Sequence, residues 1–240
     1  STGVKLKDFK VGKNDVISVH FSPKGDRIFS GTRNEDLPIK MWDTEQGTEL
    51  KTVAGSKKGV FSISYSPDEK LGLFASYNGD IVVFNLETGD EIRILEGNLS
   101  WECMACFSPD SKTIATQSRD QKIVIWDIAT GNISKKFDTK TGIIKHISYF
   151  NQGKKLLTVN DNKSVKIWDV QSGKELCTIY NLFYTDWIVV TPDGKFDGTE
   201  EGMKQLYYVK NLDFIPLESL FENYYTPKRS EERRVGKECR

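Results

Sequence analysis

An internal repeat of 42 residues limits the possible folds of this chain more than any other feature. Four segments align in one register: "IKMWDTEQG", "IVVFNLETG", "IVIWDIATG" and "VKIWDVQSG". Each segment holds one aromatic anchor residue, and consecutive anchors lie 42 residues apart, at Trp42, Phe84, Trp126 and Trp168. Repeats of this length are units that bury their apolar surface by stacking on one another. The chain is therefore expected to fold as an array of similar units.

A polar residue precedes every anchor by six positions. The side chains of Asp and Asn can accept hydrogen bonds from nearby backbone N–H groups, which stabilises turns. Because their spacing follows the repeat, we interpret these residues as structural turn residues and not as catalytic groups. They are Asp36, Asn78, Asp120 and Asn162.

Each repeat contains four short runs that suit β-strands. In the third repeat these runs are "CMACF", "TIATQ", "KIVIW" and "ISKKF". The segments between them are rich in Pro, Asp, Ser and Gly, the residues that favour turns. Four strands in about 42 residues correspond to one blade of a β-propeller. The sequence thus predicts an all-β fold with four complete propeller blades over residues 10–181.

The sequence resembles the WD-repeat β-propeller family between Val16 and Asn181. The dipeptide that names the family follows three of the anchors, and the second repeat has Phe84–Asn85 in its place. The resemblance implies a hydrogen-bonded tetrad of His, Ser or Thr, Asp and Trp in each blade. The His is missing throughout, because "GK" at Gly12–Lys13 and "GN" at Gly97–Asn98 stand where it is expected. The Asp or Asn and the aromatic anchor remain.

Partial blades are predicted at both ends of the repeat. Residues 1–9 match the stretches that follow the anchors, which predicts the outer strand of a truncated blade. Residues 182–210 are assigned to a partial last blade, with Trp187–Val190 as its inner strand. We favour an open arc that lacks blades upstream. The alternative is a closed five-blade ring in which residues 4–9 pair with the last blade.

The period changes after the last blade. Leu217, Leu220, Phe221 and Tyr224 recur with helical spacing, and Pro216 suits the first turn of a helix. This pattern predicts a short C-terminal helix within a linker over residues 211–228. Two stretches, "DWIVVTPDGKFDG" and "IPLESLFENYYTP", resemble the segment that joins a WD-repeat propeller to a caspase-like peptidase domain in bacterial multidomain proteins. Residues 229–240 resemble a translated sequencing adapter, so we interpret them as an artefactual tail and the chain as a fragment.

Several classes of function are disfavoured by the composition. The 34 Lys and Arg residues balance 34 Asp and Glu residues, which argues against nucleic-acid binding through bulk positive charge. No apolar run approaches the ~20 residues that span a membrane. His20 and His146 are isolated, and Cys103 and Cys106 form a lone CxxC pair without partners, so we expect no metal and no cofactor. The chain also lacks recognisable catalytic motifs and is predicted to be a cytoplasmic protein that is not an enzyme.

The leading prediction is a non-catalytic scaffold that binds a protein or peptide partner on one propeller face. It is pictured as the sensing or regulatory arm of a larger multidomain protein. The alternative prediction is a fragment of a caspase-like cysteine peptidase whose catalytic domain is missing. Trp101 is the preferred contact, although packing between neighbouring blades is an equally suitable role for it. The predicted partner-binding residues are Glu35, Tyr77, Trp101, Arg119 and Asp161.

Overall fold

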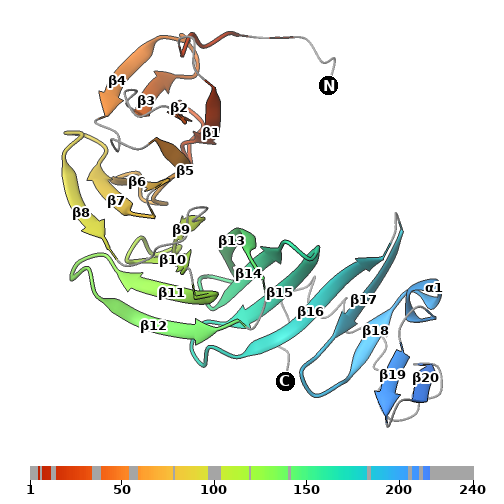
Figure 1. The fold of residues 1–240 in the computed structure, drawn as a ribbon. Coiled ribbons are helices and arrows are strands. Elements are labelled where there is room, and N and C mark those ends of the chain that lie inside the picture. Colours follow the sequence, from red (N-terminus) through yellow and green to blue (C-terminus); the bar gives the residue numbers. More distant parts are fainter. Residues whose placement is uncertain are drawn as a thin grey trace. The chain divides into compact units, whose positions relative to one another are not determined.

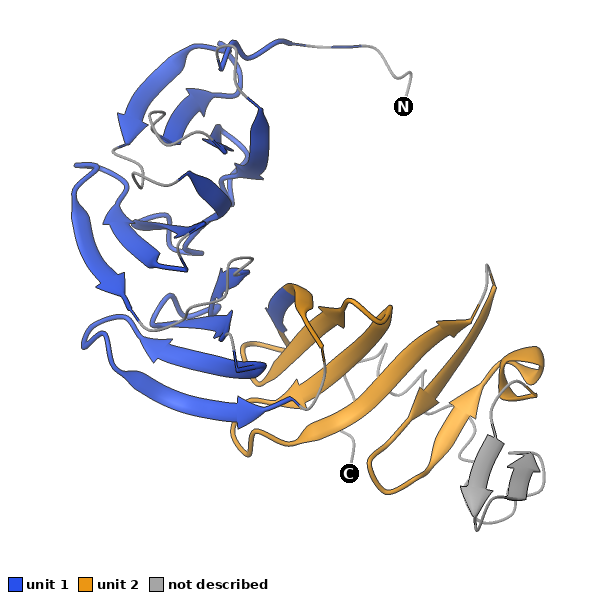
Figure 2. Ribbon diagram, in the orientation of Figure 1, with its two compact units in different colours: residues 1–140, 147–149 blue, residues 141–146, 150–240 orange. Residues whose placement is uncertain are grey.

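The computed structural model describes most of the repeat region and divides the chain into two compact units (Figure 2). The first unit comprises residues 1–140 and 147–149, and the second comprises residues 141–146 and 150–240. Side chains are described for residues 5, 7–11, 15–33, 39–53, 59–77, 79–96, 104–118, 120–139, 142–182 and 185–204. Residues 207–210 and 213–216 are described by their backbone alone.

The first unit contains three antiparallel sheets of four strands each, one for each of the first three repeats (Figure 1). Consecutive strands pair with one another in every sheet, which confirms the predicted all-β class. Blade 1 consists of β1 (Val16–Phe21), β2 (Arg27–Thr32), β3 (Ile39–Asp43) and β4 (Glu49–Val53). Blade 2 consists of β5 (Val60–Tyr65), β6 (Leu71–Ser76), β7 (Ile81–Asn85) and β8 (Glu91–Leu95). Blade 3 consists of β9 (Ala105–Phe107), β10 (Thr113–Gln117), β11 (Lys122–Asp127) and β12 (Ile133–Asp138).

The fourth repeat forms a larger sheet. Its strands are β13 (Ile144–Phe150), β14 (Lys155–Asn160), β15 (Ser164–Asp169) and β16 (Glu175–Leu182). Two further strands, β17 (Asp186–Val190) and β18 (Phe196–Gly198), continue this sheet beyond β16. Residues 147–149 of β13 belong to the first unit, and the rest of the sheet belongs to the second.

The position of β17 differs from the sequence-based expectation. Trp187–Val190 was expected to begin a new blade, but β17 pairs antiparallel with β16, in register from Thr178 opposite Val190 to Leu182 opposite Asp186. Only residues 183–185 connect these two strands. A short connection favours a hairpin, whereas a new blade requires the chain to cross from the outer edge to the inner edge. The segment therefore extends the fourth sheet.

The region after β18 begins with one helical turn. In α1 (Glu200–Met203), the hydroxyl of the preceding Thr199 accepts a hydrogen bond from the Gly202 amide at 3.2 Å. Met203 is buried and packs with Ile188 and Phe196. The strands β19 (Tyr207–Lys210) and β20 (Asp213–Pro216) then form an antiparallel pair, so Pro216 ends a strand and does not begin a helix. The predicted helical positions from Leu217 onward and the tail over residues 229–240 lie outside the described residues.

The core of the first unit lies between neighbouring blades. Alternate residues of β6 and β7 face opposite ways, as strand geometry requires. Phe74, Val82 and Phe84 pack on the apolar residues of blade 1. Leu73, Ala75, Ile81 and Val83 pack on blade 3. Blade 2 thus contributes one face to each of two apolar layers, one shared with blade 1 and the other shared with blade 3.

The first strand of blade 1 departs from this pattern. Val19 and Phe21 of β1 are 57% and 55% exposed. The residues in the same register positions of β5 are Ile63 and Tyr65, which are 3% and 4% exposed because blade 1 covers them. The same strand pattern is therefore exposed in one blade and buried in the next.

Residues 5 and 7–11 do not form the outer strand that was predicted for residues 1–9; residues 1–4 and 6 lie outside the described part. Their side chains nonetheless contact blade 1. The Phe9 ring packs edge-on against Trp42, with ring centroids 6.0 Å apart. The Lys7 side chain covers Gly47, as Lys51 covers Gly89 one blade later. The segment thus makes the contacts of an outer strand without pairing as one.

Candidate interaction surface

The three Trp anchors are buried within their blades and are bound to strand hydroxyls. Each Trp donates its indole N–H to a Ser or Thr on the second strand of its own blade. Because both partners are buried, this bond satisfies two polar groups that water cannot reach. The three bonds are Trp42 to Ser30 at 2.9 Å, Trp126 to Thr116 at 3.0 Å and Trp168 to Thr158 at 3.1 Å.

Blade 2 replaces both partners of this bond. Phe84 stands at the anchor position, and Phe74 takes the position of the hydroxyl residue. The two rings lie 6.1 Å apart. Gly72 lies opposite Phe84, and a Cβ atom added to it would lie 2.2 Å from the Phe84 ring. The anchor ring of blade 2 therefore fills the space that an aliphatic side chain occupies in blade 3.

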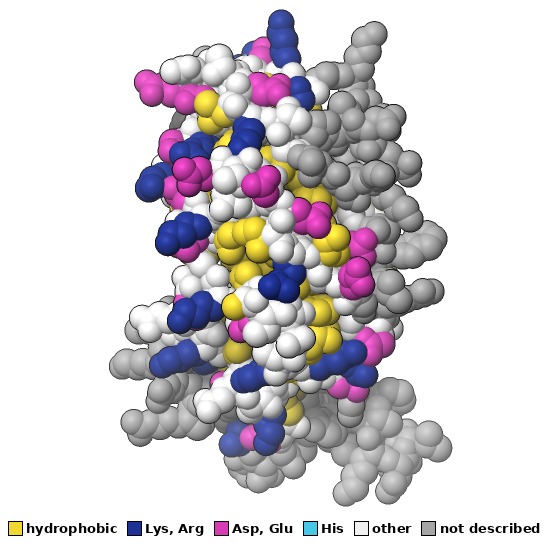
Figure 3. Space-filling view, turned by 90° about the vertical axis from the view of Figure 1, so that its left-hand side faces the viewer, with side chains coloured by type: hydrophobic (Ala, Val, Ile, Leu, Met, Phe, Trp, Pro, Cys, Tyr) yellow, Lys and Arg dark blue, Asp and Glu magenta, His cyan; other side chains and the backbone are white. Residues whose placement is uncertain are grey.

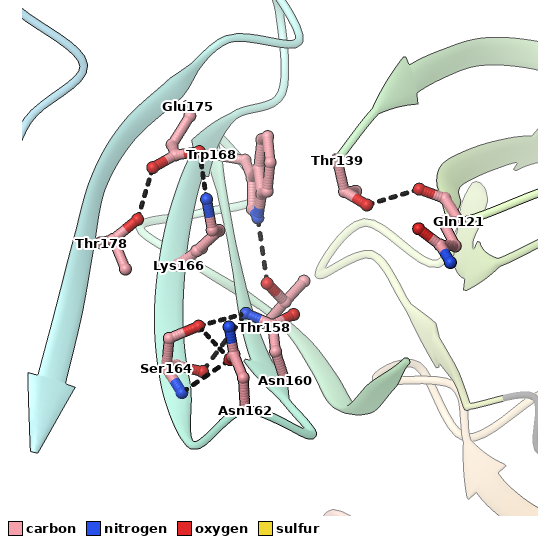
Figure 4. A network of polar contacts seen from close by, with 10 residues as sticks. All are labelled: Gln121, Thr139, Thr158, Asn160, Asn162, Ser164, Lys166, Trp168, Glu175 and Thr178. Carbon is pink, nitrogen blue, oxygen red and sulfur yellow. Dashed lines mark hydrogen bonds and ion pairs between the residues drawn. The ribbon is translucent and has the colours of Figure 1, made fainter. Parts of the chain in front are cut away.

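The polar turn residues that the structure describes bind neighbouring groups. Asn162 accepts hydrogen bonds from the Ser164 amide at 3.1 Å and the Ser164 hydroxyl at 2.6 Å (Figure 4). Asp120 accepts a hydrogen bond from the Ser118 hydroxyl and forms ion pairs with Lys122 and Lys136. These contacts hold the pKa of Asp120 well below its usual value. Asp36 and Asn78 lie outside the described residues.

In the fourth blade, polar side chains lie over the ring of the anchor Trp168 (Figure 4). The Lys166 amine lies 5.7 Å from the centre of the Trp168 ring and forms an ion pair with Glu175 at 2.6 Å. Thr178 donates its hydroxyl hydrogen to the same carboxylate. Blade 1 repeats the arrangement with Lys40, Glu49 and Thr52 over Trp42. These contacts pair the polar groups over the Trp42 and Trp168 rings with one another and so stabilise the two blades.

A different group is formed by Arg33 and Tyr77, which directly follow the second strands of blades 1 and 2, and by Phe61 in β5. The guanidinium carbon of Arg33 lies 5.9 Å from the centre of the Tyr77 ring. The Phe61 ring meets the Tyr77 ring at 84°, with centroids 5.6 Å apart. Arg33 is exposed, and the two aromatic residues are half-buried. We call these three residues the Arg–aromatic surface.

The backbone holds the Arg–aromatic surface in place. Gly59 has a φ of +74°, and an added Cβ atom would lie 2.2 Å from the Arg33 carbonyl oxygen and 3.3 Å from the Tyr77 ring. The Tyr77 amide donates to the Gly59 carbonyl at 3.4 Å, and the Arg33 amide donates to the Asp15 carbonyl at 3.4 Å. Only glycine permits this close approach, so the loops of blades 1 and 2 meet in a fixed arrangement.

The structure places Arg33 where the sequence alignment had placed Glu35. Tyr77 follows β6 directly, and Arg33 follows β2 directly with an equivalent backbone hydrogen bond. The loop after β2 is two residues longer than the loop after β6. The strand registers show this difference, since Trp42 pairs with Ile28, whereas Phe84 pairs with Gly72. The sequence already indicates the longer loop, because the Ser-Pro pair precedes the anchor by 20 residues in the first repeat and by 18 in the second. Counting back from the anchor alone missed Arg33.

Of the other predicted partner-binding residues, the structure describes only Asp161. Asp161 is exposed in the second unit, with its amide bonded to the Ile143 carbonyl at 2.9 Å and its carboxylate against Gly142. Asp161 belongs to the second unit, whereas the residues of the Arg–aromatic surface belong to the first. Glu35, Trp101 and Arg119 lie outside the described residues, so their roles stay predictions.

The described His, Cys, Asp and Glu residues do not form a cluster of three or more that could hold a metal ion. His20 and His146 are exposed. Burial raises the pKa of the Cys106 thiol to about 12, and Cys177 is fully buried. In the part of the chain that the structure describes, no helix has the length and the apolar character needed to cross a membrane.

Comparison with known families identifies two of the repeats. Residues 47–85 and 89–127 match the family described as "WD domain, G-beta repeat". The chain therefore contains WD repeats in an all-β fold, which is consistent with a WD-repeat propeller. A 71-residue stretch is 34% identical to the COMPASS component SWD3 of Saccharomyces cerevisiae. This match covers 29% of the present chain and 22% of SWD3, about a fifth of that protein.

Proposed function

We propose that this protein is a non-catalytic scaffold that binds a protein or peptide partner through the Arg–aromatic surface. The observation that carries the proposal is the exposed Arg33 side chain, whose guanidinium carbon lies over the Tyr77 ring at the junction of two blades. The WD repeats support the same class of function. The similar yeast protein is, by its name, a component of an assembly, which also fits a role in protein–protein contacts.

The chemistry of the surface suits a protein partner. Arg and Tyr are enriched among the residues that contribute most to protein interfaces. Tyr77 is held by Phe61 and by the loop at Gly59, so little side-chain freedom is lost when a partner binds. A guanidinium that lies over a ring still has N–H groups that can donate to a carboxylate or a backbone carbonyl of the partner.

Affinity capture with point variants tests this proposal. The intact protein serves as bait, and Arg33→Ala and Tyr77→Ala are compared with two control variants, Arg27→Ala and Tyr180→Ala. The controls remove the same residue types from sites outside the surface. We expect each surface variant to weaken the captured partner at least about tenfold, which corresponds to about 1.4 kcal/mol. Unchanged capture by both surface variants, with folding verified by circular dichroism, would overturn the proposed site.

We further propose that this scaffold is the sensing or regulatory arm of a larger protein with a caspase-like peptidase domain. The support is the resemblance of residues 186–198 and 215–227 to the linker in bacterial proteins of that kind. The reading frame of the parent gene tests this proposal. We expect it to encode a Cys–His peptidase after Pro227, and the present chain to show no peptidase activity. A stop codon within a few residues of Pro227 would leave a free-standing scaffold.

A further inference from the structure

The outer edges of the blades differ in how they are covered. In the fourth sheet, β17 pairs with the outer edge of β16. In the first unit the corresponding strands β4, β8 and β12 each end a sheet, and within the described residues each pairs on one side only. An unpaired edge strand presents a row of backbone N–H and C=O groups that another strand can bind.

The β16–β17 pair shows what kind of strand such an edge accepts. β17 comprises Asp186–Val190. Its residues Ile188 and Val189 are buried, with 0% and 3% of their surface exposed. The pair is antiparallel over five residue pairs on Thr178–Leu182, the part of β16 whose first two positions correspond to Ile94 and Leu95 of β8. A short, β-branched aliphatic segment is therefore a compatible fifth strand on a blade of this chain.

The three unpaired edges are not equally suited to bind a strand. Two of the solvent-exposed positions occur at the same place in the register of all three edge strands, so their side chains can be compared directly. In β12 they are occupied by Ser134 and Lys136, and Lys side chains at an edge discourage pairing. In β4 one of the two, Leu50, is aliphatic, and the other is Thr52.

Both positions are aliphatic in β8. Ile92 and Ile94 are 45% and 42% exposed. Arg93 does not protect the edge, because its guanidinium reaches the Ala129 and Thr130 carbonyls of blade 3 at 2.8 and 3.3 Å. Figure 3 faces the side on which β8 lies in Figure 1 and shows apolar side chains at the surface between charged ones.

We propose that the outer edge of β8 binds an extended peptide strand of a protein partner by antiparallel β-addition. The bound segment is a β-branched aliphatic strand similar to Trp187–Val190, and its ends are basic. The basic ends follow from Glu91 and Glu96, which are exposed at the two ends of the β8 edge. Backbone hydrogen bonds supply the affinity, and contacts with Ile92 and Ile94 select aliphatic side chains. This site is separate from the Arg–aromatic surface and does not depend on it.

A synthetic peptide tests the proposal directly. The probe is Lys-Thr-Trp-Ile-Val-Val-Thr-Lys, which places the sequence of residues 187–191, preceded by a Thr in the position of Asp186, between two lysines. Binding to the intact protein is measured by fluorescence anisotropy, and amide hydrogen exchange locates the site. We expect slower exchange in β8 when the peptide is bound. An N-methylated peptide, which cannot form the backbone hydrogen bonds on one edge, should not bind.

A matched pair of double variants provides the control. Ile92→Lys with Ile94→Lys should raise the dissociation constant at least about tenfold, because it adds edge lysines and removes the aliphatic contacts. Leu50→Lys with Thr52→Lys makes the same change at the equivalent positions of β4 and should leave binding unchanged. Arg33→Ala should also leave it unchanged, which separates this site from the first. Absence of binding, equal binding by the N-methylated peptide, or self-association through β8 in place of peptide binding would overturn the proposal.

Discussion

Blades 2 and 3 have the same strand order but differ at their centres. In blade 3, Trp126 donates to the Thr116 hydroxyl, and Ile114 packs beside them. In blade 2 the corresponding residues are Phe84, Phe74 and Gly72. No polar atom of these three side chains requires a partner. The comparison shows that the anchor position demands a large buried ring and does not demand a hydrogen bond.

The changes in blade 2 depend on one another. Replacing only the Trp would leave a buried hydroxyl without its donor, and replacing only the hydroxyl residue would leave an indole N–H without its acceptor. Either single change has a cost of about 1–3 kcal/mol, whereas loss of both partners can be nearly neutral. Gly72 completes the set, because the Phe84 ring occupies the space where a side chain would begin. The three residues of blade 2 are therefore compatible with one another, and they form a different type of blade centre from that of blade 3.

The largest effect is expected when blade 2 receives the aliphatic residue of blade 3. Gly72→Ile should lower the free energy of unfolding by about 3 kcal/mol, because its Cβ atom alone would lie 2.2 Å from the Phe84 ring. Urea unfolding followed by tryptophan fluorescence measures the change. Ile114→Val, a mild change at the equivalent position of blade 3, should cost about 1 kcal/mol. A similar loss in both variants would mean that the Phe84 ring is not confined.

A double-mutant cycle in blade 3 gives the next largest effect. Thr116→Val should cost about 1–3 kcal/mol, because the buried Trp126 N–H loses its acceptor. Adding Trp126→Phe removes that donor, so the double variant should lose about 1 kcal/mol less than the sum of the single changes. Thr48→Val in an exposed turn is the control and should stay within about 0.5 kcal/mol. Strict additivity of the two changes would contradict the proposed role of the bond.

The smallest effect concerns the acidic residue near the anchor of blade 1. The Lys40 amine, and then the Thr52 hydroxyl, hold the pKa of Glu49 below its ordinary value of 4.5. Because this pKa is lowered on folding, the contribution to stability is present above pH 4.5 and is lost as the pH falls through the folded-state pKa. The loss should stay below about 1 kcal/mol, since the Glu49 side chain is 36% exposed.

Unfolding free energies measured in steps from neutral to acidic pH test this expectation. Blade 3 has Ile133 at the equivalent position, so Glu49→Ile converts one arrangement into the other. The variant should remove part of the acid-induced destabilisation. Identical pH profiles for the variant and the natural sequence would show that the ion pair adds nothing measurable.

Part of the interaction surface could be predicted from the sequence, and part could not. Tyr77 was found because it stands just before a repeat position that marks a turn. Its neighbours Arg33 and Phe61 were missed. Arg33 begins a loop that is two residues longer than its counterpart in blade 2, and Phe61 reaches Tyr77 from another strand. A repeat alignment assigns equivalent positions within blades but does not report which side chains meet at their junction.

The sequence by itself determined the all-β class, the four-strand repeat and the burial of the anchors at Trp42, Phe84, Trp126 and Trp168. These features follow from local patterns, since strand alternation and turn residues act over a few positions. Tertiary structure decided that β17 joins β16, that the Phe84 ring excludes a side chain at Gly72, and that Val19 is exposed where Ile63 is buried. In each case the local pattern shows that a segment forms a strand. Which edge that strand joins and what covers its face depend on residues far away in the chain, and only packing selects them.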